Sequence, residues 1–151
     1  MTERISLQDV QKGLIDGLLK TESYIKKSGL DLKLVELVKY RVSQINGCAF
    51  CLDMHHKEAT AMGETELRLH SLAAWRECPY YSEKEIAVLA YAEALTDGDQ
   101  HAIDNSFDTL STLFSKAEIA DLTVAVSQIN SWNMINKAFK PIPGNYKVGQ
   151  Y

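Results

Sequence analysis

Residues 34–51 read LVELVKYRVSQINGCAFC, and this segment combines a helical apolar stripe, a break and a pair of cysteines. The apolar side chains recur at spacings of three and four, the period of one face of an α-helix: Leu34, Val38, Val42 and Ile45. Asp31 can cap the start of this helix, and Gly47 is the kind of residue that ends one. The segment therefore predicts a helix from about residue 31 to residue 46, with the cysteines immediately beyond it.

The helical period continues through the rest of the chain. Further stripes have the same spacing: Leu7, Val10, Leu14 and Leu18; Ile86, Leu89 and Ala90; Leu122, Val126, Ile129 and Trp132. Two capping boxes, Ser82-x-x-Glu85 and Ser115-x-x-Glu118, mark helix starts. No stretch alternates apolar and polar residues for long enough to indicate a sheet. We expect an all-α fold in which residues 1–151 form one domain of about six or seven helices.

Composition and charge exclude several classes of protein. The 151 residues are 46% hydrophobic and 24% charged, as in an ordinary globular domain. Sixteen basic and twenty acidic side chains give a formal charge of -4, which argues against a nucleic-acid partner. The longest uncharged apolar stretch, residues 86–92, is far shorter than the roughly 20 residues that span a bilayer, so we expect no membrane partner. No secretory signal is visible, and the expected location is the cytoplasm.

A short internal repeat links two of the stripes. Residues 42–46, VSQIN, recur as residues 126–130. Gly47 follows the first copy and breaks its helix, whereas Ser131 follows the second copy and nothing comparable breaks that one. A match of five residues is too short to establish a duplication, so no function is inferred from it.

The cysteine content points to chemistry rather than to a disulfide scaffold. There are three cysteines, an odd number, and Cys48 and Cys51 form one C-x-x-C pair. In a short chain without a secretory signal, such a pair is redox-active or binds a metal. Cys78 precedes Pro79 at an expected helix end, and we interpret it as a small packed thiol.

The position of the C-x-x-C at the start of a helix favours reactivity. Asn46 or Gly47 can cap a helix that begins here, which places Cys48 in its first turn. The unsatisfied N–H groups and the positive end of the helix dipole stabilise a thiolate there. Residues three apart share a helix face, but a disulfide needs Cβ atoms within about 4.5 Å, closer than the usual ~5–6 Å. A frayed first turn beside a glycine can supply that adjustment.

His55 is expected on the same helix face as the cysteines. At about 100° per residue, His55 is roughly 20° around the helix axis from Cys48, and Cys51 is roughly 60° from Cys48. An imidazole one turn after Cys51 can take a proton from a thiol and return it to a leaving group. His56 points away by the same geometry, and we interpret it as a solvated surface side chain.

A histidine base is usually oriented by a carboxylate, and the sequence offers two. Glu58 lies three residues after His55 on the same helix face. Glu36 lies beside the apolar stripe of the preceding helix and could reach back across the helical hairpin. The sequence leaves both open, although we expect the substitution Glu36→Gln to reduce activity more than Glu58→Gln.

This spacing resembles a known signature. Glu36, the segment SQINGC at residues 43–48, Cys51 and His55 together look like the active site of the alkylhydroperoxidase D family. That family belongs to the wider carboxymuconolactone decarboxylase superfamily of small helical proteins. The long spacing from carboxylate to histidine is far more specific than a bare C-x-x-C, which occurs in many unrelated proteins.

The resemblance implies a thiol-dependent peroxidase or a general dithiol oxidoreductase with an antioxidant role. One thiolate attacks a peroxide oxygen and becomes a sulfenic acid, and the other thiol condenses with it to a disulfide. In such a site Cys51 would attack, Cys48 would resolve, and His55 with Glu36 would relay the proton. The residues themselves leave the order open, because the helix dipole favours a thiolate at Cys48 and the histidine favours one at Cys51.

The resemblance also implies the partners: a hydroperoxide substrate, an external dithiol that reduces the disulfide, and further copies of the chain in a trimer or hexamer. No cofactor and no metal ion is expected. Two hypotheses of other classes remain. A zinc protein would use the cysteine pair and His55, with His70 or Cys78 as a fourth ligand, although structural zinc sites often use two separated ligand pairs. A non-catalytic helical assembly module would have cysteines of ordinary reactivity.

Overall fold

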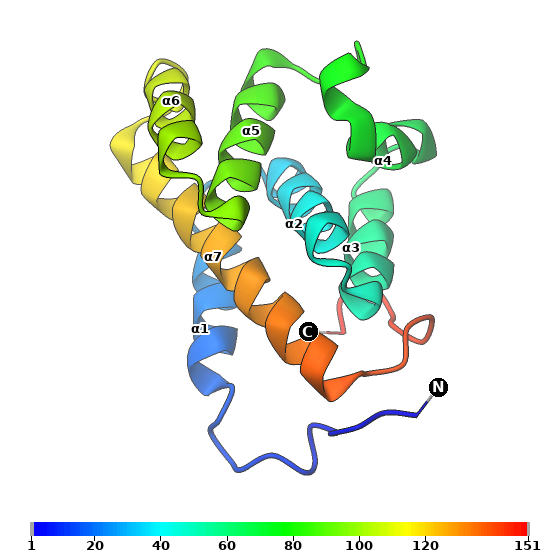
Figure 1. Cartoon of the computed structure of the whole chain (residues 1–151). Coiled ribbons are helices and arrows are strands. Elements are labelled where there is room, and N and C mark those ends of the chain that lie inside the picture. Colours follow the sequence, from blue (N-terminus) through cyan, green and yellow to red (C-terminus); the bar gives the residue numbers. More distant parts are fainter. Residues whose placement is uncertain (1, 151) are drawn as a thin grey trace.

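The computed structural model describes residues 2–150, and within them the chain forms helices joined by short turns (Figure 1). The α-helices are α1 (Asp16–Ile25), α2 (Leu32–Asn46), α3 (Ala49–Ala61), α4 (Glu66–Ser71), α5 (Glu83–Asp97), α6 (Gln100–Ser111) and α7 (Lys116–Phe139). A 3₁₀ helix, η1 (Leu72–Glu77), lies between α4 and α5. The described residues contain no strand, so the all-α prediction is confirmed, and the seven α-helices fall within the expected number.

The predicted helix starts are confirmed by their hydrogen bonds. The side chain of Asp31 accepts a hydrogen bond of 2.9 Å from the N–H of Lys33 at the start of α2. Ser82 and Ser115 both form complete capping boxes, at the starts of α5 and α7. These caps satisfy N–H groups that have no partner inside the helix, which is why the short signals are reliable.

The first apolar stripe gave a wrong prediction, because α1 begins only at Asp16. Upstream, the side chain of Asp9 accepts a hydrogen bond of 2.8 Å from the N–H of Ser6 and closes a turn. Gly13 then adopts a positive φ of 88°, which is incompatible with a continuing helix. Leu14 is 61% exposed, so burial against this chain does not stabilise a helix there.

Helix α2 lies at the centre of the fold and buries two faces. On one side Val38 belongs to an apolar cluster shared with α1, α5 and α7, and on the other Leu37 belongs to a cluster shared with α3, α5 and the α4–η1 segment. Helix α7 crosses the molecule beside α1, α2 and α5, and α3 lies against the other side of α2 (Figure 1). Polar groups carried by α2 are therefore held in the interior, between α3 and α7.

The two ends of the described chain lie against different helices, the N-terminal segment against the last turn of α7 and the C-terminal tail against α3. The N–H groups of Arg4 and Ile5 donate to the carbonyl of Phe139 at 2.8 and 3.1 Å. Lys140 adopts a positive φ of 56° and Pro141 follows, so the chain leaves the helix and returns along α3, as Figure 1 shows. Proline has no N–H group to donate, so Pro141 cannot continue the helix.

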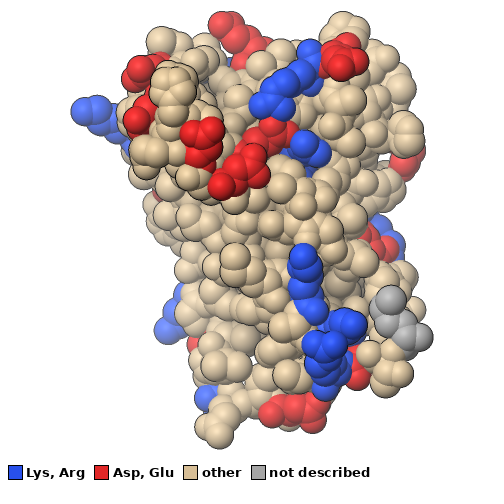
Figure 2. All heavy atoms as spheres, viewed as in Figure 1, with Lys and Arg blue, Asp and Glu red and all other residues tan. Residues whose placement is uncertain are grey.

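Charged side chains are distributed unevenly over the surface. On the face seen in Figure 2, acidic side chains gather toward the end of the molecule where α5 and α6 lie, and uncharged side chains cover most of the middle. None of the helices within residues 2–150 is long and apolar enough to cross a membrane.

Candidate active site

The turn between α2 and α3 is built by Gly47. Its φ of 62° and ψ of 40° are left-handed, and its N–H donates to the carbonyl of Gln44 at 3.2 Å. The N–H of Cys48 then donates to the carbonyl of Ser43 at 3.1 Å. This tight turn lets α3 begin at Ala49, the residue after Cys48. The position of the cysteine pair is therefore set by the end of α2 as much as by α3 itself.

Cys48 occupies the N-cap position of α3, one residue earlier than the first turn in which it was expected. Its sulfur accepts a hydrogen bond of 3.4 Å from the N–H of Cys51. A side chain at this position can satisfy one of the unpaired N–H groups of the helix, a role usually taken by serine or aspartate. The helix start therefore offers Cys48 a backbone donor that favours the thiolate form.

The two cysteines lie at disulfide-bonding distance, with their sulfurs 2.15 Å apart and their Cα atoms 5.3 Å apart. They are 1% and 2% exposed. The non-helical backbone of Cys48, with φ of -91° and ψ of 97°, supplies the freedom that two residues inside a regular helix would lack. The pair is thus a buried disulfide at the start of α3.

His55 shares the buried face of α3 with Cys51 and Ala59, at successive spacings of four residues. Its Nδ1 lies 2.7 Å from Oε2 of Glu36, and the two residues are 4% and 7% exposed. When the imidazole is neutral and the carboxylate ionised, Nδ1–H donates to Glu36 and the lone pair is left on Nε2. The carboxylate thereby fixes the tautomer in which the histidine can act as a base.

A buried lysine extends this pair into α1. Nζ of Lys39 lies 3.6 Å from Oε1 of Glu36 and 2.8 Å from Oε2 of Glu22. Burial alone would raise the pKa of Glu36, but the neighbouring His55 and Lys39 outweigh it and hold that pKa below its ordinary value. Burial likewise acts to lower the pKa of Lys39, and the two carboxylates outweigh it and raise that pKa. Glu36 is therefore kept ionised in the interior.

Of the two candidate carboxylates, Glu36 contacts His55 and Glu58 is engaged elsewhere. Oε1 of Glu58 accepts a hydrogen bond of 2.8 Å from the N–H of Gly149 and another from the hydroxyl of Tyr146. Both donors belong to the C-terminal tail. His56 lies 3.0 Å from Glu66 at the surface, in keeping with its interpretation as a surface side chain.

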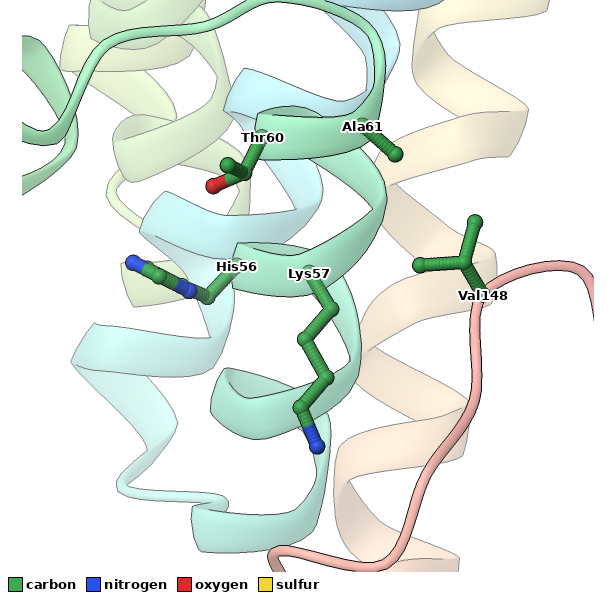
Figure 3. Close-up of a pocket in the computed structure, with 5 residues that line it drawn as sticks. All are labelled: His56, Lys57, Thr60, Ala61 and Val148. Atoms are coloured by element: carbon green, nitrogen blue, oxygen red, sulfur yellow. The ribbon is translucent and has the colours of Figure 1, made fainter.

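The tail also forms a pocket with the outer flank of α3. Nζ of Lys57 donates to the carbonyls of Gly144 and Tyr146, both at 3.0 Å. Beside this contact lies an open pocket of about 330 Å³, where Val148 of the tail faces the helix (Figure 3). It is lined by His56, Lys57, Thr60, Ala61 and Val148, and by neither cysteine. This pocket is therefore separate from the buried sulfur pair.

Helix α7 contributes residues to the site that the sequence did not indicate. Nδ2 of Asn136 lies 3.4 Å from the sulfur of Cys51. One turn earlier, Nδ2 of the fully buried Asn133 donates to the hydroxyl of Ser43 at 3.1 Å. These contacts join positions 85 and 90 residues apart, so no local pattern could reveal them. The only signal in the sequence was that asparagines recur every three residues, at Asn130, Asn133 and Asn136.

The side chains proposed for a zinc site are not gathered in one place. His70 is exposed at the end of α4, and the half-buried Cys78 caps the end of η1, with its sulfur 3.4 Å from the carbonyl of Ala74. Among residues 2–150, no group of three or more histidine, cysteine, aspartate or glutamate side chains is arranged to hold a metal ion. The prediction of Cys78 as a packed thiol at a helix end is confirmed.

Comparison with known proteins places this geometry in a family. The model of the carboxymuconolactone decarboxylase family matches residues 13–94, which include the whole segment from Glu36 to His55. The chain belongs to this family. The uncharacterized protein YdfG of Bacillus subtilis (strain 168) is 38% identical over 139 residues, which cover 91% of this chain and 95% of YdfG. The resemblance inferred from the cysteine motif is therefore confirmed at the level of the family.

Solved structures of similar proteins share the fold. The crystal structure of ATU0492 from Agrobacterium tumefaciens superposes on this chain with a TM-score of 0.90. The two sequences are 37% identical, and the match covers 96% of this chain and 100% of that one. ATU0492 is a protein of unknown function that carries the name of a candidate antioxidant defence protein, AhpD. The debrominase Bmp8 is 19% identical, covers 87% of this chain and 72% of that one, and has a TM-score of 0.77, a similarity of fold alone.

Proposed function

We propose that this family member is a thiol-dependent peroxidase that reduces hydroperoxides through a disulfide between Cys48 and Cys51. The observation that carries the proposal is a buried cysteine pair followed, on the same buried face of α3, by His55, whose Nδ1 lies 2.7 Å from the ionised Glu36. A purely structural cysteine pair has no need of an oriented base on the same helix face. The AhpD name of ATU0492, 37% identical over nearly the whole chain, supports the same activity.

The proposed reaction has two balanced steps. The thiolate of Cys51 attacks one peroxide oxygen and breaks the O–O bond, which gives a sulfenic acid on Cys51 and, with one proton, an alcohol. The thiol of Cys48 then attacks the sulfenic sulfur, forms the S–S bond and releases water. An external dithiol returns both sulfurs to thiols and leaves as a disulfide.

His55 and Glu36 are the proposed proton relay. The imidazole Nε2 accepts the proton of the Cys51 thiol and returns it to the departing alkoxide, directly or through one water. Glu36 holds the ring and stabilises its protonated form, the role that a carboxylate has in other histidine-dependent sites. Since Cys48 and Cys51 are 1% and 2% exposed, a peroxide reaches their sulfurs only after a small local opening, which favours small substrates.

Further copies of the chain are the proposed partners in a homo-oligomer. Several large apolar side chains are exposed on helix surfaces and near the chain ends: Leu14, Leu67, Met134 and Val148. Burial of such side chains against other copies would remove apolar surface from water. A trimer or hexamer is the expected assembly, to be measured by light scattering.

The test is peroxide consumption by the purified chain with a small dithiol reductant and cumene hydroperoxide. The wild type is expected to turn over repeatedly, whereas Cys51→Ser consumes none. Cys48→Ser cannot form the internal disulfide, so it turns over only as fast as the dithiol reduces the sulfenic acid of Cys51 directly. Cys78→Ser is the matched control, since Cys78 lies at the end of η1, and its rate stays at the wild-type value. Repeated turnover by Cys51→Ser, or none by the wild type, would contradict the proposal.

A further inference from the structure

Helix α7 presents a row of asparagine side chains to the turn that carries the cysteines. Asn130, Asn133 and Asn136 follow one another at spacings of three, so they share one face of the helix. Oδ1 of Asn130 and Oδ1 of Asn133 accept hydrogen bonds of 2.8 and 2.9 Å from Nδ2 of Asn46, the last residue of α2. Two of the three amides therefore fix the end of α2 against α7.

A lysine of α7 also binds the end of α2, on the exposed side of the contact between these two helices. Nζ of Lys137 donates to the carbonyl of Asn46 at 2.7 Å. Together with the hydrogen bond from Asn133 to Ser43, this places the last turns of α2 and α7 in a defined relation. The third amide of the row is thus held at a fixed place beside the start of α3.

That third amide, Asn136, is directed at the sulfur of Cys51. Its Nδ2 lies 3.4 Å from Sγ. A sulfur within a disulfide carries no hydrogen, so it can only accept, and the amide must present its N–H group. The two sulfurs of the pair consequently have different donors: Cys48 has the backbone N–H of Cys51, and Cys51 has the side chain of Asn136.

We infer that Asn136 is a catalytic residue of the proposed peroxidase reaction, because its amide donates to the Cys51 sulfur and stabilises the attacking thiolate. The inference rests on the proposed function, and it gives Cys51 a side-chain donor of its own beside the backbone donor of Cys48. A hydrogen bond to an ionised acceptor is stronger than one to its neutral form, so the donor favours the thiolate over the thiol.

The role of Asn136 differs from that of the proton relay. An amide neither accepts nor releases a proton in this reaction, so Asn136 changes the fraction of Cys51 that is thiolate and leaves proton delivery to His55. Other charged or titratable side chains surround the site from the helices packed around it: Cys48, His55, Glu36, Lys39 and Lys137. Cys48 is replaced by serine in all of the variants compared below, and the other four groups are present in each of them, so a difference between variants reports the residue that was changed.

The experiment measures the pH dependence of Cys51 alkylation by iodoacetamide. The reduced full-length chain carries Cys48→Ser and Cys78→Ser, so that Cys51 is the thiol observed. Asn136→Leu removes the donor, and Asn136→Asp replaces it with a carboxylate that repels the thiolate. Asn105→Leu makes the same chemical change on the exposed surface of α6 and is the matched control.

We expect Asn136→Leu to move the midpoint of the alkylation profile upward by about one to two pH units, the size expected for a lost hydrogen bond to a charged group. Asn136→Asp moves it further in the same direction, and Asn105→Leu leaves it in place. Circular dichroism of each variant checks that the helices are intact, and the aspartate variant keeps the shape of the side chain if the leucine variant folds poorly.

Unchanged midpoints in folded Asn136→Leu and Asn136→Asp would overturn the inference and leave the proposed function standing. The converse result is distinct. If the midpoints shift but the wild-type chain consumes no hydroperoxide, the proposed function fails, while the amide remains assigned as the donor that stabilises the Cys51 thiolate.

Discussion

The two VSQIN segments, one at the end of α2 and the other within α7, have the same sequence and bury different faces. In the first copy the valine and the serine are buried, Val42 and Ser43. In the second copy the serine is exposed and three other residues are buried: Val126, Gln128 and Ile129. The copies meet at equivalent asparagines, since Asn46 donates to Asn130 at 2.8 Å. Which side chains of the identical segments are buried is therefore decided by the helices that pack against each copy.

The residue that follows each copy explains why only one of them carries a site. Gly47 adopts a left-handed conformation and ends α2, whereas Ser131 stays helical and α7 continues to Phe139. At the same offset of 84 residues, the second copy has unreactive side chains in place of the relay and the pair: Ala120 for Glu36, Trp132 for Cys48, Ile135 for Cys51 and Phe139 for His55. The reactive arrangement belongs to the flanks of the first copy, and the second copy supplies support.

The largest expected effect on peroxide turnover comes from substitution of the residues that flank the first copy. His55→Ala is expected to slow peroxide turnover by about 10²–10⁴-fold, the usual contribution of a positioned acid–base. Glu36→Gln is expected to have a smaller effect in the same direction, because the ring keeps a hydrogen-bond partner but loses the charge that stabilises its protonated form. Both rates are measured as peroxide consumption with excess reductant.

Glu58→Gln is the matched control for the carboxylate. Its side chain is bound by the tail through Tyr146 and Gly149, so its loss changes turnover little. Full activity of His55→Ala near neutral pH would contradict the relay. A greater loss for Glu58→Gln than for Glu36→Gln would reassign the orienting role.

An exchange of the residues that follow the two copies sharpens the comparison further. Gly47→Ser is expected to destabilise the fold by about 1–2 kcal/mol, because φ of 62° is costly for a residue with a Cβ. No atom lies within 4 Å of a Cβ built at Gly47, so the cost is in the backbone alone. Ser131→Gly is expected to cost only about 0.5 kcal/mol, the difference in helix propensity.

Urea unfolding followed by circular dichroism measures both free energies. Equal losses for the two variants would show that the left-handed turn at Gly47 is not what separates the copies. If Gly47→Ser lost activity while its free energy of unfolding stayed unchanged, the turn would matter only for the placement of the cysteines.

The smallest expected effect is a change in how stability depends on pH. The pKa of Glu36 lies below its ordinary value of 4.5, so its ionised form stabilises the fold above that pH. The stabilisation is lost as the pH falls through the lowered value, when Glu36 takes up a proton in the folded chain. Glu36→Gln should therefore unfold with a flatter pH dependence in acid than the wild type. Glu77→Gln, at an exposed position, is the control and keeps the wild-type slope.

Local signals in the sequence predicted much of the fold. The caps at Asp31, Ser82 and Ser115 and the break at Gly47 depend on residues within a few positions of one another, and all four are confirmed. The helix predicted from the stripe that includes Leu14 was wrong, because that prediction depended on distant packing rather than on local contacts. A helical period forms a helix only where its apolar face is buried, and the turn at Gly13 intervenes.

The components of the site divide in the same way. The spacing of Cys48, Cys51 and His55 along one helix is local and was found from the sequence. The choice between Glu36 and Glu58 depended on the tail, since the hydroxyl that binds Glu58 lies 88 residues away in the chain. Asn136 and the ion pair of Lys39 with Glu22 are likewise tertiary contacts, fixed by how α7 and α1 pack against α2.

The central claim is that Cys48 and Cys51 act as one reversible unit toward peroxide. Stopped-flow mixing of the fully reduced chain with an organic hydroperoxide, followed by mass spectrometry of the quenched product, tests it most directly. The account predicts rapid oxidation that forms one Cys48–Cys51 disulfide for each peroxide reduced, with Cys78 left as a free thiol. Oxidation no faster than that of a free thiol in solution, or a product disulfide that includes Cys78, would contradict it.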